Sequence, residues 1–253
     1  MTTLLERIIE AHGGEERWRQ VGDILARVSM GGMEFASRMQ GAPLRDVEVT
    51  VTASTPAVSL SEWPGEGRSG HFTPSRVWVE AADGSLVAER SAPGATFRTL
   101  RHWLWWDELD VLYYCGMSLW QALCQPFSLL RSGCELEEID PVDLAGERWH
   151  CLRVVFPADV PSLSPDQLLY ADAAGLLHRI DYAPSLYGAF WRVAQALEDH
   201  DVFDGFVHAT RRRVFPCMPN GQMLRATRLA WLHLDDVSVV RRTERIVDEP
   251  PAG

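Results

Sequence analysis

Four side chains able to move protons or hold charge occur close together in the last third of the sequence: Asp181, Tyr182, His200 and Arg212. A carboxylate, a phenol and an imidazole can act as general acids or bases, and a guanidinium can hold a carboxylate or an enolate. If the strands that carry these groups pair in sequence order, the groups meet on one part of a sheet. We therefore expect any acid–base catalysis to use these four residues.

The same region also fits a structural role. Alternate positions of 176–182 and 207–215 mix apolar and charged side chains, which is typical of a solvated sheet face with Asp–Arg pairs across strands. The sequence places His178 on the face of Tyr182, where it would line the floor of a cavity if that face turns inward. His200 follows two acidic residues in a segment interpreted as a loop, where nearby carboxylates would raise the pKa of its imidazole.

Aromatic residues are the second chemical signal, because the chain contains 10 tryptophans. Large aromatic side chains fill cores, but they also line pockets for apolar ligands. Three of the tryptophans fall within four residues of each other and cannot all point one way, so at least one faces solvent, a partner or a cavity. The candidate ligand-binding residues of this segment are Trp103, Trp106, Tyr113, Met117 and Trp120.

Sequence motifs for metals and cofactors are missing. The chain has no glycine-rich phosphate loop, no nucleophile elbow and no His-Glu-x-x-His sequence, and His12 with Glu15 is a single pair. We therefore predict neither a metal nor a cofactor. The five cysteines are widely spaced and form no Cys-x-x-Cys pair, and Glu6, Arg7 and Glu10 interrupt any signal-peptide core. These features predict a cytoplasmic protein with reduced thiols.

The periodicity of apolar residues predicts the elements that must position these groups. Residues 2–20 have helical spacing, interrupted at Gly13-Gly14 and resumed as a short second turn over 15–18. From residue 24 the period changes to two. The segment 103–130 is apolar on nearly all sides, with Asp107 as a helix cap and Pro126 at its end, so it must be buried. We predict a mainly β (α+β) fold in a single domain, 1–253. About eleven strands over 24–240 would form a half-open antiparallel barrel around the helical plug 103–130, and the tail 242–253 would be frayed.

Composition and charge exclude several classes of protein. The chain has 253 residues, of which 46% are hydrophobic and 23% charged, so it is neither disordered nor fibrous. Its net charge of −11 without a basic cluster argues against binding to nucleic acid. No apolar stretch reaches the roughly 18 residues that a membrane helix needs, so we expect no membrane insertion.

The order of several short motifs resembles the lipoprotein-carrier-like superfamily, the fold of the bacterial outer-membrane lipoprotein chaperones, and most closely its functionally uncharacterised bacterial members. The resemblance implies a hydrophobic cavity between sheet and helices, suited to acyl chains or other apolar molecules. The motifs are Ala11-His12-Gly13-Gly14 with Arg17-Trp18, Trp106-Asp107-Glu108-Leu109, Gly146-Glu147 with Trp149, Tyr170 to Tyr182, and Asp204 to Arg212.

Three functions remain open from the sequence. The first is binding of a hydrophobic small molecule, acyl, polyketide or terpenoid-like, in an aromatic-lined cavity. The second is a cofactor-independent cyclase or isomerase of natural-product biosynthesis, which would draw its rate from orientation in a dry pocket. The third is a protein-interaction module with an open sheet edge, or a lipoprotein carrier. An apolar cavity would favour a carrier, convergent polar groups an enzyme, and a filled core a partner protein.

Overall fold

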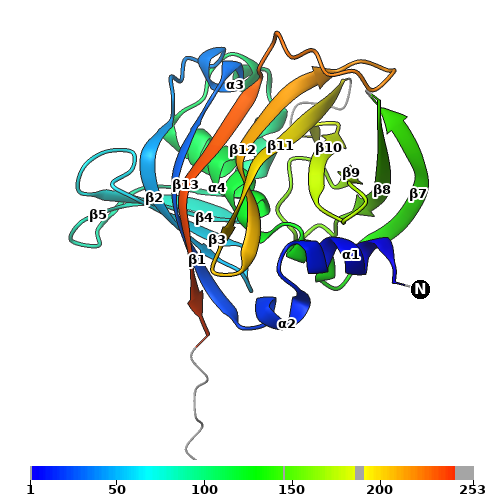
Figure 1. Ribbon diagram of the computed structural model, residues 1–253. Helices are drawn as coiled ribbons and strands as arrows, with labels where there is room; N and C mark the ends of the chain where they lie inside the picture. The colour runs from blue at the N-terminus through cyan, green and yellow to red at the C-terminus, as the bar shows by residue number, and fades with distance from the viewer. Residues whose placement is uncertain (1, 145, 186–190, 243–253) are drawn as a thin grey trace, which may run out of the picture.

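A single antiparallel sheet of 13 strands dominates the fold (Figure 1). The computed structural model describes residues 2–144, 146–185 and 191–242, so residues 243–253 of the predicted frayed tail lie outside the described ones. The strand order is β6-β5-β4-β3-β2-β1-β13-β12-β11-β10-β9-β8-β7. The two end strands, β6 and β7, do not pair with each other, so the sheet is open.

The elements follow one another along the chain, with the helices concentrated at the N-terminus and in the middle. The helices are α1 (Leu4–Ala11), α2 (Glu15–Trp18), α3 (Met33–Ala36) and α4 (Glu108–Cys124), with 3-10 turns η1 (Pro93–Arg98), η2 (Leu100–Trp103) and η3 (Phe127–Leu130). The strands are β1 (Val21–Gly31), β2 (Leu44–Thr52), β3 (Ala57–Ser61), β4 (Arg68–Thr73), β5 (Arg76–Ala81), β6 (Leu86–Ser91), β7 (Glu135–Leu144), β8 (Glu147–Val155), β9 (Asp166–Ala171), β10 (Leu177–Tyr182), β11 (Arg192–Phe203), β12 (Phe206–Cys217) and β13 (Ala230–Arg241).

The prediction of about eleven strands is wrong, because the sheet has 13 and the sequence pattern did not indicate β4 and β11. The sheet is also not closed into a barrel. Strand β4 has little apolar alternation, because packing requires a glycine in it. A Cβ at Gly70 would lie 2.7 Å from the ring of Trp63 and 3.0 Å from Leu112. Strand β11 ends in acidic residues, which led us to place His200 in a loop, although it pairs with Ala209 inside the sheet.

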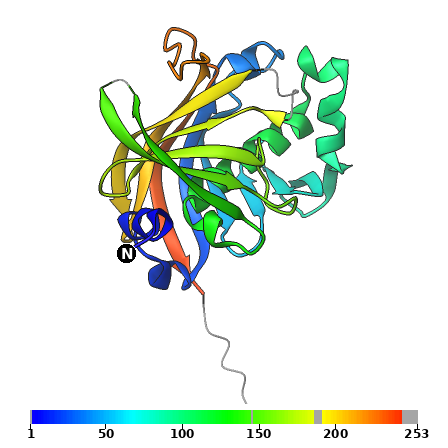
Figure 2. The ribbon, with the colours of Figure 1, turned by 90° about the vertical axis from the view of Figure 1, so that its right-hand side faces the viewer.

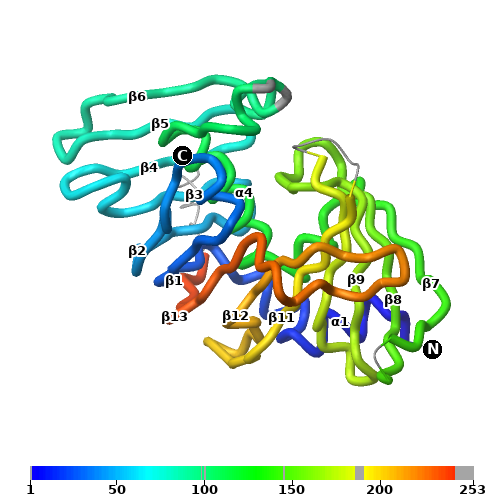
Figure 3. Tube along the Cα trace, turned by 90° about the horizontal axis from the view of Figure 1, so that it is seen from above, coloured from blue at the N-terminus to red at the C-terminus, as the bar shows by residue number. Residues whose placement is uncertain are grey.

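Helix α4 is the buried plug that the sequence predicts. Asp107 caps its N-terminus by accepting a hydrogen bond from the Asp110 backbone N–H at 2.9 Å, and the helix ends at Cys124, just before Pro126. The helix packs against β2–β6, and the sheet curves around it (Figure 3). A Cβ at Gly116 would lie 2.3 Å from Phe72, so the glycine allows this close approach.

The N-terminal helical segment is divided into α1 and α2 at Gly13-Gly14, where the sequence pattern is interrupted. Gly13 and Gly14 have φ angles of +125° and +85°, which end α1 before α2 begins. Helices α1 and α2 lie at one end of the strands and α3 lies at the other (Figures 1 and 2). No helix among the described residues is long and apolar enough to cross a membrane.

Candidate functional site

A cleft of about 270 Å³ lies between α3, the N-terminal half of α4 and strands β10–β13. Most of its wall is apolar. Trp103 and Trp191 stand at its mouth, where 47% and 64% of their surfaces are exposed. The lining residues are Met33, Glu34, Ser37, Arg38, Trp103, Tyr114, Leu163, Tyr182, Pro184, Trp191, Val193, Val214, Leu229 and Ala230.

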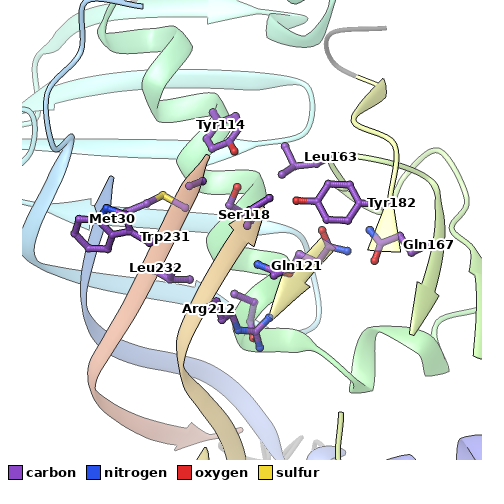
Figure 4. A pocket seen from close by; sticks show the side chains of 14 residues that line it. Met30, Tyr114, Ser118, Gln121, Leu163, Gln167, Tyr182, Arg212, Trp231 and Leu232 are labelled. Carbon is purple, nitrogen blue, oxygen red and sulfur yellow. The ribbon is translucent and has the colours of Figure 1, made fainter. Parts of the chain in front are cut away.

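The cleft continues inward into a smaller polar space of about 30 Å³ (Figure 4). The two spaces adjoin, because both are lined by Tyr114, Leu163, Tyr182, Val214 and Ala230. The inner space adds the amides Gln121, Gln167 and Gln195, the hydroxyl of Ser118 and the guanidinium-bearing Arg212. An apolar channel therefore ends in a set of hydrogen-bonding groups.

Helix α4 supplies one wall of the inner space through a polar stripe on an otherwise apolar helix. Tyr114, Ser118 and Gln121 are spaced by four and three residues, which places them on one face. The opposite face packs on β2–β6. The sequence analysis missed Ser118 and Gln121 because it considered only the apolar residues of this helix. Two polar residues at helical spacing in a buried segment would have indicated a polar face.

Three of the ten predicted site residues line the cleft: Trp103 at the mouth, Tyr182 in the middle and Arg212 at the inner end. Tyr182 forms no hydrogen bond to another described residue, and burial raises the pKa of its phenol, so the hydroxyl stays protonated and can donate. The Arg212 Nη2 donates to the Ala122 carbonyl at 2.6 Å and its Nη1 to Gln125 Oε1 at 3.4 Å. Arg212 thus caps the last turn of α4.

Asp181 lies on the opposite face of β10 from Tyr182, because successive side chains of a strand point to opposite faces. Its carboxylate accepts from Arg179 Nε at 2.6 Å and from the Tyr170 hydroxyl at 3.0 Å, and all three side chains are buried. Arg179 also donates to the Gly221 carbonyl at 2.7 Å. The pair joins the sheet to the connection between β12 and β13, so Asp181 does not face the cleft.

His178 and His200 belong to a third location, near α1. Their rings are 5.0 Å apart, and the His200 Nε2 donates to the Leu177 carbonyl at 2.9 Å. Burial lowers the pKa of His200, which corrects the raised pKa expected from its acidic neighbours in sequence. The structure therefore separates the four predicted acid–base residues and does not gather them at one site.

Four of the aromatic-segment candidates are packed in the core instead of lining the cleft. Trp106 is fully buried between Phe35 and Phe97, and Trp120 donates from its indole N–H to the Thr52 carbonyl at 3.1 Å. Tyr113 lies against Phe72, and Met117 is 3% exposed. Neither space of the cleft is lined by any of the four.

Metal binding finds no geometric support within the described part of the chain. Its His, Cys, Asp and Glu side chains form no group of three or more that could hold an ion. The five cysteines, all among the described residues, are free thiols, and burial raises the pKa of Cys115 and Cys124, so these two are unreactive.

Comparison with solved structures identifies the fold. A DUF1329 family protein from Desulfovibrio piger ATCC 29098 is 10% identical, with 93% of this chain and 91% of that chain covered at a TM-score of 0.50. A LolA superfamily protein from Nitrosomonas europaea is 11% identical, with 97% and 96% covered at a TM-score of 0.50. The chain has a LolA-like fold. This confirms, at the level of the fold, the predicted resemblance to lipoprotein-carrier-like proteins.

Sequence comparisons add no closer relative: no family model matches the chain, and no curated protein matches it. The structural comparisons do correct one prediction, the cytoplasmic location. The Nitrosomonas europaea protein that shares the fold is a LolA superfamily protein, and this is the fold of the bacterial outer-membrane lipoprotein chaperones. We therefore withdraw the cytoplasmic location, which had rested on cysteine spacing and on charges near the N-terminus.

Proposed function

We propose that this protein binds a hydrophobic small molecule in the cleft between α4 and strands β10–β13. The observation that carries the proposal is the apolar cleft of about 270 Å³, which opens to the surface between Trp103 and Trp191. Apolar walls in contact with water are unfavourable, and an apolar ligand that covers them gains roughly 25 cal/mol for each Å² removed from water. The LolA-like fold supports the same class of function.

The apolar lining of the cleft favours a ligand with a large apolar part, such as an acyl, polyketide or terpenoid-like molecule. Catalysis by the four predicted residues receives no support, because Asp181 and His200 lie away from the cleft that Tyr182 and Arg212 line.

A lipid chain that is attached to a protein is the second candidate, and the open mouth favours it. Trp103, Trp191 and Met33 at the mouth are between 47% and 64% exposed. A chain could enter tail first there while its attachment point stays outside. The LolA superfamily member among the similar structures also favours a carrier of this kind.

A tryptophan that fills the cleft tests the proposal. Val214 lines both spaces of the cleft, so Val214→Trp should lower the affinity for a fluorescent fatty-acid probe at least tenfold. Val202 is 63% exposed in the β11–β12 hairpin and lines neither space, so Val202→Trp is the matched control. Fluorescence titration of both folded variants measures the effect.

The expected result is loss of binding in Val214→Trp alone. If the wild-type protein fails to bind the probe and also fails to bind longer isoprenoid and polyketide probes, the proposal is wrong. Equal binding by Val214→Trp and the wild type would place the ligand somewhere other than this cleft.

A further inference from the structure

The inner end of the cleft carries more hydrogen-bonding capacity than the protein itself uses. Figure 4 shows the hydroxyl groups of Tyr114, Ser118 and Tyr182 directed toward one another across the inner space, with Gln121 beside them. The Ser118 hydroxyl is buried and has no hydrogen-bond partner among the described residues. Burial raises the pKa of Tyr114 and Tyr182, so both phenols remain donors.

The side-chain amide of Gln167 also has a hydrogen-bonding atom that the described residues leave unused. Its Nε2 donates to Ser162 Oγ at 2.8 Å and to the Ser164 carbonyl at 3.1 Å, which fixes the orientation of the amide. Only 2% of the residue is exposed, and its buried Oε1 accepts no hydrogen bond from the described residues. This atom is an acceptor, so water or a ligand group that donates a hydrogen bond can satisfy it, and a carboxylate oxygen cannot.

Arg212 adds a positive charge without a counter-ion. It is 4% exposed, and no described carboxylate lies within ion-pair distance of its guanidinium, whose contacts are the neutral Ala122 carbonyl and Gln125. Its Nε has no hydrogen-bond partner there. Burial lowers its pKa to about 10, so it remains charged at neutral pH. A buried unpaired charge is expensive, and a bound anion offsets this cost.

The acidic groups of the cleft lie at its other end. Among the described residues, no aspartate or glutamate lines the inner space, whereas Glu34 lies in the outer part and pairs with Arg38 at 3.1 Å. The outer wall is therefore apolar with a neutralised ion pair, and the inner wall is polar with a net positive charge. This polarity along the cleft fits an amphiphile rather than a pure hydrocarbon.

We propose that the ligand is a free carboxylic acid with an apolar tail, bound with its carboxyl group inward at the hydroxyl groups of Tyr114, Ser118 and Tyr182, with the positive charge of Arg212 farther along the same space. The inference rests on the proposed function and names the ligand class for the same site. The hydroxyl groups donate hydrogen bonds to the carboxylate, and the positive charge of Arg212 stabilises it through space, while the tail lies along the apolar wall toward Trp103. A chain joined to a protein through its carbonyl lacks the free carboxyl group, so inward binding of the acid separates this ligand from a lipidated protein.

Three ligands with the same tail test the proposal: dodecanoic acid, dodecan-1-ol and methyl dodecanoate. The wild-type protein should bind the acid at least tenfold more tightly than the ester at neutral pH, with the alcohol between them. Isothermal titration or displacement of a fluorescent probe measures the three affinities. Equal affinities for all three ligands would overturn the carboxylate assignment while leaving hydrophobic binding intact, and no binding of any ligand would instead count against the proposed function.

Variants then separate recognition of the head group from structural support. Ser118→Ala and Tyr182→Phe each remove one hydroxyl from the wall and should lower the preference for the acid over the ester about threefold or more. Arg212→Met removes the nearby positive charge and should also lower that preference, and Arg213→Met on the opposite face of β12 is its control. A purely structural Arg212 would weaken acid and ester equally. Should Arg212→Met fail to fold, an unchanged acid preference in both hydroxyl variants would still refute the proposal.

Discussion

The two faces of α4 differ in how closely they pack on the sheet and in the polarity of the side chains opposite them. Toward β2–β6 the helix packs directly on the sheet, and the described residues of those strands bury only apolar side chains and glycine. Toward β9–β12 a cleft lies between the helix and the sheet, and these strands line it with the buried polar side chains of Gln167 and Arg212. One side is a filled core and the other is a cleft lined with groups that need partners.

This difference assigns stability and binding to opposite faces of one helix. Close packing on the β2–β6 side holds α4 in place, as the contact of Gly116 with Phe72 shows. A rigid helix can then present Tyr114, Ser118 and Gln121 to the cleft. Polar groups that lower stability when unpaired are concentrated where a ligand can reach them.

The largest expected effect is on the filled side. Trp120→Ala removes a fully buried ring and should lower the free energy of unfolding by about 3–5 kcal/mol. The affinity of the folded fraction for a fatty-acid probe should stay within about twofold of the wild type, because Trp120 does not line the cleft. Urea unfolding and probe titration together measure both quantities. A stable variant that loses the probe would contradict the division between the two sides.

A fall in pH should lower the free energy of unfolding by a smaller amount than Trp120→Ala does, because two buried histidines must take up protons. Burial lowers the pKa of His12 to about 4 and of His208 to about 3, against about 6.5 in the unfolded chain. The unfolded chain therefore takes up protons first as the pH falls below 6.5, and stability declines from there. His12 alone should account for about 2 kcal/mol by pH 5.

Urea unfolding at intervals between pH 7 and pH 5 measures this decline, in a range where carboxylates titrate little. His12→Leu removes one titrating group and should flatten the curve, although it also removes the hydrogen bond from His12 Nδ1 to the Ile8 carbonyl. An equally steep curve in His12→Leu would show that other groups cause the decline.

The smallest effect concerns the mouth of the cleft. Trp103→Ala should weaken binding of the fatty-acid probe about threefold while changing the free energy of unfolding by less than about 0.5 kcal/mol, because the side chain is half exposed. Trp105 is 42% exposed and does not line the cleft, which makes Trp105→Ala a matched control. Identical probe affinities in the two variants would remove Trp103 from the binding surface.

Local signals predicted the elements that are defined by local interactions. The cap at Asp107 and the stop at Pro126 depend on neighbours in sequence, and both were predicted in place. Strand β4 was missed because its form depends on Trp63 and Leu112, which come from other elements.

The candidate site was harder to predict for the same reason. Tyr182 and Asp181 are adjacent in sequence, yet only the curvature of the sheet decides which of them faces α4. Leu163 and Met33 reach the cleft from a loop and from a short helix that have no distinctive pattern. Arg212 was singled out for its chemistry, but its buried position under the last turn of α4 depends on contacts across 90 residues.

The open sheet has a consequence for the range of molecules that the cleft can hold. In a closed barrel, the number of strands and their stagger fix the radius, and a wider lumen requires hydrogen bonds to break. Here β6 and β7 end the sheet without meeting. A small change of twist in β7–β10 can therefore move Tyr182 and Leu163 relative to α4 while every strand pair stays intact. The width of the binding space can therefore change, and the hydrogen-bonding groups at its inner end must determine which ligands bind.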